Sequence, residues 1–213
     1  MTAADFIDRH QGPWQALWQD LARRPPEADL LAQLAARYSE AHRHYHTLQH
    51  LDACLRHLAR LREQARHPSE VAIALWFHDA VYDIGASDNE RRSADWARTA
   101  LRTAGVTQEM ADRVDGLIMV TRHDQPPQTP DQALLLDIDL AILGAPALVF
   151  DGYEQQIFRE YRSVPPAAMR SNRRRILQGF LDRPRIYHTQ AMHDAREAQA
   201  RDNLRRSIQA LAA

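Results

Sequence analysis

The chain contains no lysine, and all 27 of its basic residues are arginine. This absence excludes a P-loop lysine, a Schiff-base lysine and a lysine general base. The single cysteine, Cys54, excludes an internal disulfide framework and a cysteine-rich zinc site, and we expect its side chain to lie in the core. The 27 basic and 28 acidic residues nearly cancel. Bulk charge therefore gives no reason to expect a nucleic-acid polymer or an anionic membrane as a partner.

Long apolar runs and glycine are also scarce. No uninterrupted apolar run approaches the length of a membrane span, and Asp5 and Asp8 stand where a signal peptide would be basic and then apolar. We therefore expect a soluble, cytoplasmic protein. Alternation of apolar and polar residues with a period of two is nowhere sustained, which predicts an all-α fold of roughly ten helices. With 213 residues and no internal repeat, the sequence predicts one domain over residues 1–213.

Apolar spacing and the residues at segment ends predict where the helices lie. The first is expected to begin at Pro13, which suits a first-turn position, and to stop at Arg24. The others are expected at about residues 27–39, 47–61, 68–79, 88–105, 108–120, 134–144, 147–162, 167–181 and 190–212. The polar, proline-rich segment 121–130 is expected to form a surface loop.

The most apolar of these segments runs from Val71 to Phe77 and follows the helix start at Pro68, so it predicts a central helix covered on all sides. His78 and Asp79 stand at its end. Burial of a carboxylate is energetically unfavourable unless another group pairs with it. Imidazole and carboxylate groups are common ligands of divalent metal ions. Adjacent helical residues point about 100° apart, so the two can share one ion only beyond the helix end.

Two other predicted helices carry residues of the same chemical type. Four of the eleven histidines fall within residues 42–50, and Thr47 as an N-cap places His50 in the first turn of a helix. Asp137 and Asp139 interrupt a second buried apolar stretch. Two imidazoles and two carboxylates make a mixed set that suits iron, manganese, nickel, zinc or magnesium, with positions left for water.

The order His50, then His78-Asp79, then Asp139 resembles the signature of the HD superfamily of metal-dependent phosphohydrolases. Further words are similar to a bacterial subgroup of predicted HD phosphohydrolases of about this length; they are Tyr45-His46, Trp76 to Asp83, Asn89-Glu90 with Ser93-Ala94, Asp137 to Leu140, Arg159 to Tyr161, and Ala200-Arg201 with Asn203-Leu204.

The resemblance implies an all-α HD-domain helical bundle with a metal site between its central helices. It implies one divalent ion held by His50, His78, Asp79 and Asp139, the last chosen over Asp137 because in the superfamily the second aspartate of such a pair binds the ion. It also implies hydrolysis of a phosphate ester or anhydride of a small phosphorylated molecule, such as a nucleotide, by water that the metal activates.

One departure from the superfamily affects the choice of catalytic residues. Some single-metal members place a glutamate three residues after the His-Asp pair to assist the attacking water, whereas this chain has Tyr82 there. Asp83 or Glu90 is expected to take that role, with Asp79 as the metal-bound catalytic carboxylate. The candidate substrate-binding residues are Arg43, His46 and His123.

A second hypothesis is a regulatory module that keeps the metal or nucleotide site but has lost turnover. The absence of the helper glutamate and of any lysine favours it. A helical di-iron oxidase would instead need Glu-x-x-His words on facing helices, and the sequence contains none.

Overall fold

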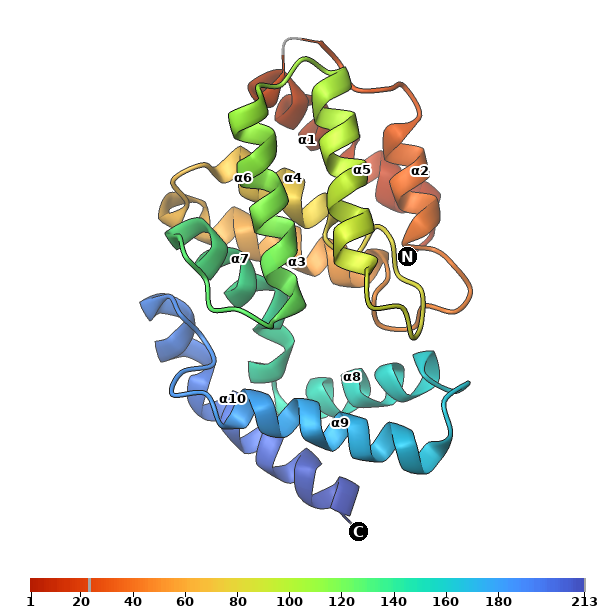
Figure 1. Ribbon diagram of the computed structural model, residues 1–213, viewed down its shortest axis with the longest axis vertical. Coiled ribbons are helices and arrows are strands. Elements are labelled where there is room, and N and C mark those ends of the chain that lie inside the picture. Colours follow the sequence, from red (N-terminus) through yellow and green to blue (C-terminus); the bar gives the residue numbers. More distant parts are fainter. Residues whose placement is uncertain (23, 213) are drawn as a thin grey trace. The chain divides into compact units, whose positions relative to one another are not determined.

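A computed structural model describes residues 1–22 and 24–212, and every regular element in them is a helix (Figure 1). The α-helices are α1 (Ala3–Leu21), α2 (Leu30–Arg37), α3 (Leu48–Leu61), α4 (Pro68–Phe77), α5 (Asn89–Thr103), α6 (Gln108–Met119), α7 (Pro130–Asp139), α8 (Ala147–Glu160), α9 (Pro166–Leu181) and α10 (Gln190–Ala212). Three short 3-10 helices are η1 (Arg62–Gln64), η2 (Val120–Arg122) and η3 (Leu140–Gly144). For the described residues, the predicted all-α class with roughly ten helices is confirmed.

Contacts between residues divide the chain into two compact units, Met1–Leu135 and Leu136–Ala213. The division falls inside α7, so this helix carries the chain from the first unit into the second. The prediction of one domain over residues 1–213 stays a prediction.

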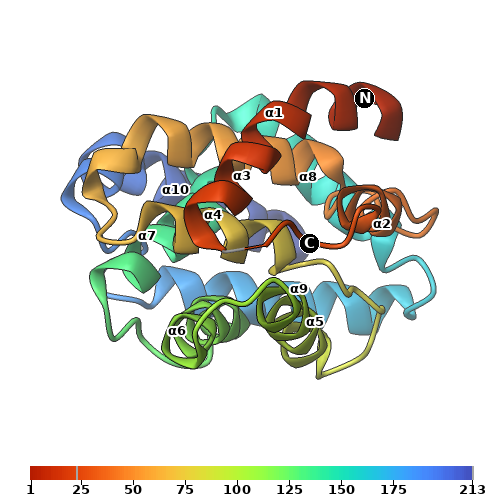
Figure 2. The same cartoon turned by 90° about the horizontal axis from the view of Figure 1, so that it is seen from above.

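Helix α4 is the centre of the first unit. It contacts α1, α3, α5 and α6, and Figure 2 shows it between α3 on one side and α5 and α6 on the other. Every residue from Ser69 to Phe77 is buried. A helix that is apolar on all faces must be covered on all faces, so the predicted central helix is confirmed.

The start of α1 differs from the prediction. The helix begins at Ala3, ten residues before the predicted start at Pro13, which lies inside it. Thr2 accepts a hydrogen bond from the Asp5 amide, and the Asp5 carboxylate accepts one from the Thr2 amide, which together form a capping box. This cap fixes the early start, although Pro13 supplies no amide hydrogen to the helix.

Three other predicted end signals are in place. Thr47 caps α3 by accepting from the Gln49 amide, and Pro68 is the first residue of α4. Gly105 follows α5 with a φ of 81°, a left-handed conformation that glycine adopts without steric cost. The segment predicted as the loop 121–130 contains the end of η2 and the first residue of α7.

Two buried carboxylates join helices of the first unit to one another. The Arg113 guanidinium on α6 donates to both Glu70 carboxylate oxygens on α4, at 2.8 and 2.6 Å. His10 Nε2 on α1 lies 2.9 Å from Asp52 Oδ1 on α3. Both carboxylates are 4% exposed, and a buried carboxylate is tolerated only when it is paired.

In the second unit, η3 packs closely against α10. The Asn203 side chain donates to the carbonyl oxygens of Leu143 and Ala145 at 2.9 and 2.8 Å. The Gly144 amide donates to the Tyr187 hydroxyl at 2.9 Å. A Cβ atom on Gly144 would lie 2.6 Å from the Arg196 Cβ and 2.8 Å from the Arg196 carbonyl oxygen. Only glycine therefore fits at this crossing.

The segment before α10 is fastened by a further carboxylate, that of Glu197. Glu197 accepts from the Ile186 and Tyr187 amides, all at 3.1 Å, and pairs with Arg201. Burial raises the pKa of Glu197, but these amide and guanidinium donors outweigh it and hold the pKa below its ordinary value of 4.5.

No single helix among the described residues is long and apolar enough to cross a membrane. One bent pair, Pro130–Gly144 with Ala147–Glu160, meets the length and composition criteria together, with a bend of 102° between its parts.

Candidate metal centre

Helix α3 carries the first imidazole of the candidate centre. The Thr47 cap starts the helix one residue before Leu48, so His50 lies in its first turn on the buried side. Cys54 stands four residues later, and residues four apart share a helix face. Both residues are buried, with His50 6% exposed and Cys54 1%.

Helix α4 carries the second imidazole to the same place. His78 is the C-terminal cap of α4 and keeps helical φ and ψ values of −54° and −38°. Its side chain is 1% exposed, whereas that of Asp79, beyond the helix end, is 18% exposed. The predicted position of the His-Asp pair at the end of the central helix is confirmed.

The donor atoms of these residues converge. His50 Nε2 lies 3.2 Å from His78 Nε2, and Asp79 Oδ2 lies 3.2 Å from His78 Nε2 and 3.6 Å from His50 Nε2. Two ligands that each sit about 2.0–2.1 Å from a tetrahedral ion are separated by about 3.3 Å. The three spacings fit ligation of one ion.

The tautomer of His78 is set by the helix itself. Its Nδ1 lies 2.8 Å from the Leu75 carbonyl oxygen, which can only accept, so Nδ1 carries the proton. Nε2 is then left with its lone pair, directed toward His50 Nε2 and the Asp79 carboxylate. An imidazole oriented by a backbone carbonyl in this way is a usual arrangement for a metal ligand.

The charge on Asp79 is favoured by its surroundings. Burial raises the pKa of Asp79, but the neighbouring imidazoles of His78 and His46 outweigh it. The imidazole of His50 acts in the same direction, and the pKa lies well below its usual range. The carboxylate is therefore ionised, as a metal ligand must be.

Cys54 was expected to be a core residue, and it contacts the centre. One donor atom each from His50, Cys54 and His78 lies within 4.8 Å of the others, a group that could hold a metal ion. The Cys54 sulfur is 3.7 Å from His50 Nε2 and 3.8 Å from Nδ1. Because it is nearly equidistant from both nitrogens, it lies against the ring and away from the line of the Nε2 lone pair. The His-x-x-x-Cys spacing was the available sequence signal.

Two buried side chains hold the turn that follows α4. The Tyr38 hydroxyl accepts from the Asp79 amide and donates to the Trp76 carbonyl, both at 3.2 Å. Arg43 donates to the carbonyl oxygens of Asp79 and Ala80 at 2.6 and 3.1 Å. These bonds fix the backbone from which the Asp79 carboxylate projects.

Arg43 was predicted to bind substrate. Its side chain is 0% exposed, and it also donates to the His46 carbonyl at 3.2 Å and to the Glu40 carboxylate at 3.1 Å. Arg43 thus positions two backbone segments, the loop that contains His46 (the His46 loop) and the turn at Asp79 that follows α4 (the Asp79 turn). No sequence signal distinguished this role, which depends on the path of the loop.

His46 lies at the edge of the centre. Its ring stacks on Tyr82 with 4.2 Å between centroids and meets His50 edge-on at 5.9 Å. The residue is half-buried, and it influences the charge of Asp79. His46 is therefore close enough to Asp79 to border the same site.

The other candidate residues of the first unit have varied surroundings. Asp83 is exposed, and its carboxylate accepts from Arg92 at 2.6 Å. Glu90 lies in the first turn of α5 and is half-buried. His123 follows η2 with a φ of 58°, a left-handed conformation that is uncommon outside glycine, and is also half-buried. Their predicted catalytic and substrate-binding roles stay predictions.

The two aspartates of α7 belong to the second unit and differ sharply. Asp137 is fully buried and accepts from the amides of His188 and Thr189 at 2.7 and 2.6 Å and from the Thr189 hydroxyl at 2.6 Å. Its carboxylate is thereby committed to the segment before α10. Asp139 is the last residue of α7 and is half-buried. Of the two, Asp139 is the carboxylate that remains suited to a ligand role.

Comparison of the chain with family models, with curated proteins and with solved structures found no match.

Proposed function

We propose that this chain is a metal-dependent phosphohydrolase with an HD-type fold. Its substrate is a phosphate ester or anhydride of a small phosphorylated molecule, such as a nucleotide. One divalent ion, of iron, manganese, nickel, zinc or magnesium, is held by His50, His78 and Asp79 from the first unit and by Asp139 from α7. The sequence order of these four residues, which resembles the HD signature, supports the assignment.

The convergence of the three donor atoms of the first unit carries this proposal. Two imidazole nitrogens 3.2 Å apart, in an interior where each is almost fully enclosed, need a shared proton or a shared ion. Because the Leu75 carbonyl fixes His78 with its Nε2 lone pair inward, and the Asp79 carboxylate completes the triangle, the set suits a cation. The commitment of Asp137 elsewhere supports Asp139 as the ligand from α7.

The chain's own residues have distinct roles in the proposed reaction. A divalent ion bound here supplies a water molecule of lowered pKa and polarises a phosphoryl oxygen. Asp79 contributes negative charge and an acceptor for a water proton at the exposed edge of the centre. His46, beside Asp79, is placed to contact substrate. Arg43 and Tyr38 hold the Asp79 backbone so that the carboxylate does not reorient.

One observation favours the alternative of a metal-binding or nucleotide-binding module without turnover. The candidate helper Asp83 is ion-paired with Arg92 at 2.6 Å, and the residue at the helper position, Tyr82, stacks on His46. Asp83 is therefore not a free carboxylate, and Tyr82 has none. Neither side chain supplies the carboxylate that would assist the attacking water.

The experiment is elemental analysis of purified protein, followed by a hydrolysis screen with a broad panel of phosphorylated compounds. We expect a stoichiometric divalent metal in the wild-type chain and its loss in His78→Ala, whereas His193→Ala, which removes a histidine remote in sequence on α10, keeps it. We expect hydrolysis that Asp79→Ala abolishes. Metal without any product would favour the silent module. Equal metal content in wild type and His78→Ala would overturn both.

A further inference from the structure

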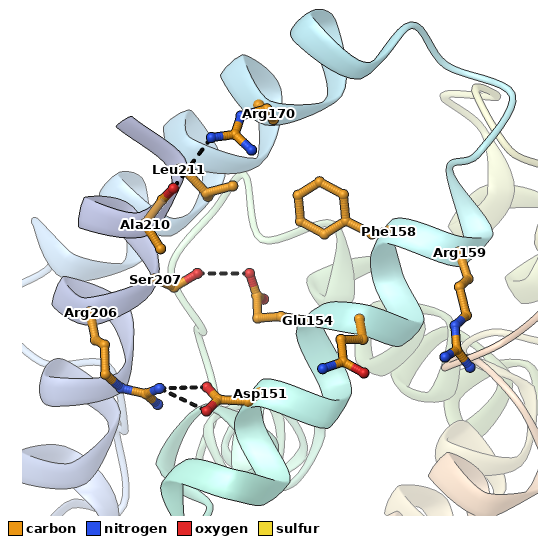
Figure 3. A pocket seen from close by; sticks show the side chains of 10 residues that line it. Asp151, Glu154, Phe158, Arg159, Arg170, Arg206, Ser207, Ala210 and Leu211 are labelled. Atoms are coloured by element: carbon orange, nitrogen blue, oxygen red, sulfur yellow. Dashed lines mark hydrogen bonds and ion pairs between the residues drawn. The ribbon is translucent and has the colours of Figure 1, made fainter. Parts of the chain in front are cut away.

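The second unit contains a pocket of about 490 Å³ whose residues come from α8, α9 and α10. Figure 3 shows its wall residues. Those on which the argument depends are Asp151, Glu154, Phe158, Arg170, Arg206 and Leu211. All of them lie within the second unit, and none is a candidate residue of the metal centre.

Both carboxylates in this pocket are neutralised by neighbouring groups of the protein. Asp151 accepts from Arg206 at 2.6 and 2.8 Å. Glu154 accepts from the Ser207 hydroxyl at 2.9 Å and is ion-paired with the buried Arg173. An anion entering the pocket therefore meets two carboxylates whose charges are already balanced.

Arg170 is the cation that remains. Among the described residues its guanidinium has a single hydrogen-bond acceptor, the neutral Ala210 carbonyl at 3.3 Å, and no carboxylate. The guanidinium of a second wall arginine, Arg159, has no hydrogen bond or ion pair to any of the residues that the structure describes. With Asp151 and Glu154 already paired, the pocket has a surplus of positive charge. A guanidinium is suited to bidentate binding of a carboxylate or phosphate.

An apolar surface faces this charge. Figure 3 shows the Phe158 ring directed into the space between α8 and the end of α10, with Arg170, Ala210 and Leu211 beside that space. Phe158 and Leu211 are half-buried, so each leaves part of its surface open. A flat apolar group can cover an aromatic face favourably.

We propose that this pocket binds a small organic anion with a flat apolar body, such as an aryl phosphate or aryl carboxylate. The anionic group of the ligand binds the Arg170 guanidinium, and its ring packs against Phe158 and Leu211. The separated positions of charge and apolar surface distinguish this ligand from inorganic phosphate and from an uncharged aromatic molecule. The site is independent of the proposed hydrolase reaction, because no metal ligand contributes to it.

The test is isothermal titration calorimetry of the full chain with phenyl phosphate, after chelation of metal. We expect saturable binding whose dissociation constant rises at least about tenfold in Arg170→Gln and about fivefold in Phe158→Ala. Arg174→Gln, which removes an exposed arginine of the same helix outside the pocket wall, should bind as wild type does. Inorganic phosphate should bind at least about tenfold more weakly than phenyl phosphate.

Two further arms assign the site and the ligand class. His78→Ala should bind phenyl phosphate unchanged, which separates the pocket from the candidate metal centre. Tighter binding of phenyl phosphate than of benzoate would identify a phosphate site, and the reverse a carboxylate site. Absence of saturable binding of both compounds to the wild-type chain overturns the proposal. So does unchanged binding in an Arg170→Gln variant whose far-UV circular dichroism matches wild type.

Discussion

Replacing Gly144 by alanine tests the close contact between η3 and α10. The added Cβ would lie 2.6 Å from the Arg196 Cβ and 2.8 Å from its carbonyl oxygen, whereas non-bonded carbons prefer about 3.5–4.0 Å. One of the two backbones must therefore move by about 1 Å. The Gly144 amide bond to Tyr187 and the Asn203 bonds to η3, now 2.8–2.9 Å long, would lengthen with it.

The expected destabilisation follows from these parts. Overpacking of a core costs about 1–3 kcal/mol, and each weakened hydrogen bond adds about 1 kcal/mol. We expect the free energy of unfolding to fall by about 4–6 kcal/mol. With a urea m-value of about 2–3 kcal/mol/M, the midpoint of unfolding falls by roughly 1–3 M.

The assay is urea unfolding followed by far-UV circular dichroism, which reports helices of both units. Tryptophan fluorescence is unsuitable alone, because all four tryptophans precede residue 136. Matched controls are Gly152→Ala in α8 and Gly179→Ala in α9, where a Cβ meets no atom within 4 Å. These should be stabilised by about 0.5–1 kcal/mol. A Gly144→Ala midpoint equal to that of the controls would refute the reasoning.

Three other predictions concern single side chains. Arg113→Met leaves the Glu70 carboxylate buried without its partner, and we expect the free energy of unfolding in urea to fall by about 2–3 kcal/mol. This is less than the loss expected on breaking a fully buried ion pair, because the Arg113 side chain is 36% exposed. An unchanged midpoint of unfolding would contradict this. The pKa of Glu197 lies below 4.5 in the folded chain, so its stabilisation is present above that pH and is lost as pH falls through the folded-state pKa. Glu197→Gln should therefore lose less stability than wild type between about pH 5 and 3, and parallel losses would count against it. In Arg43→Lys, the lysine ammonium cannot bridge the carbonyl oxygens that the guanidinium bridges. We expect metal binding at Asp79 to weaken by about 10–100-fold, measured by competition with a chelator. Unchanged affinity would show that the turn at Asp79 holds its shape without the guanidinium.

The helices were predictable where end signals and apolar spacing agree. Thr47, Pro68 and Gly105 mark ends through local chemistry that depends on few neighbours, and the structure has them in those roles. Pro13 misled because proline suits a first turn in general, whereas here the capping box at Thr2 starts the helix earlier.

The candidate site was predictable in part for the same reason. A helix that is apolar on every face must end in the interior, so His78 and Asp79 were expected there. The role of Arg43 was not predictable, because the direction of its guanidinium depends on how the His46 loop folds back on the Asp79 turn. The commitment of Asp137 likewise depends on the segment before α10, more than 50 residues further along the chain.

The unequal enclosure of the three donor side chains of the first unit has a kinetic consequence. The side chains of His50 and His78 are 4% and 1% exposed, whereas that of Asp79 is 18% exposed. A hydrated cation arriving from solvent thus meets the carboxylate first and must shed water before either imidazole can reach it. Capture would proceed in two stages, with a fast encounter that slows as ionic strength rises and a slower step set by dehydration. Release would retrace the slow step, so a bound ion would exchange sluggishly even where its equilibrium affinity is modest.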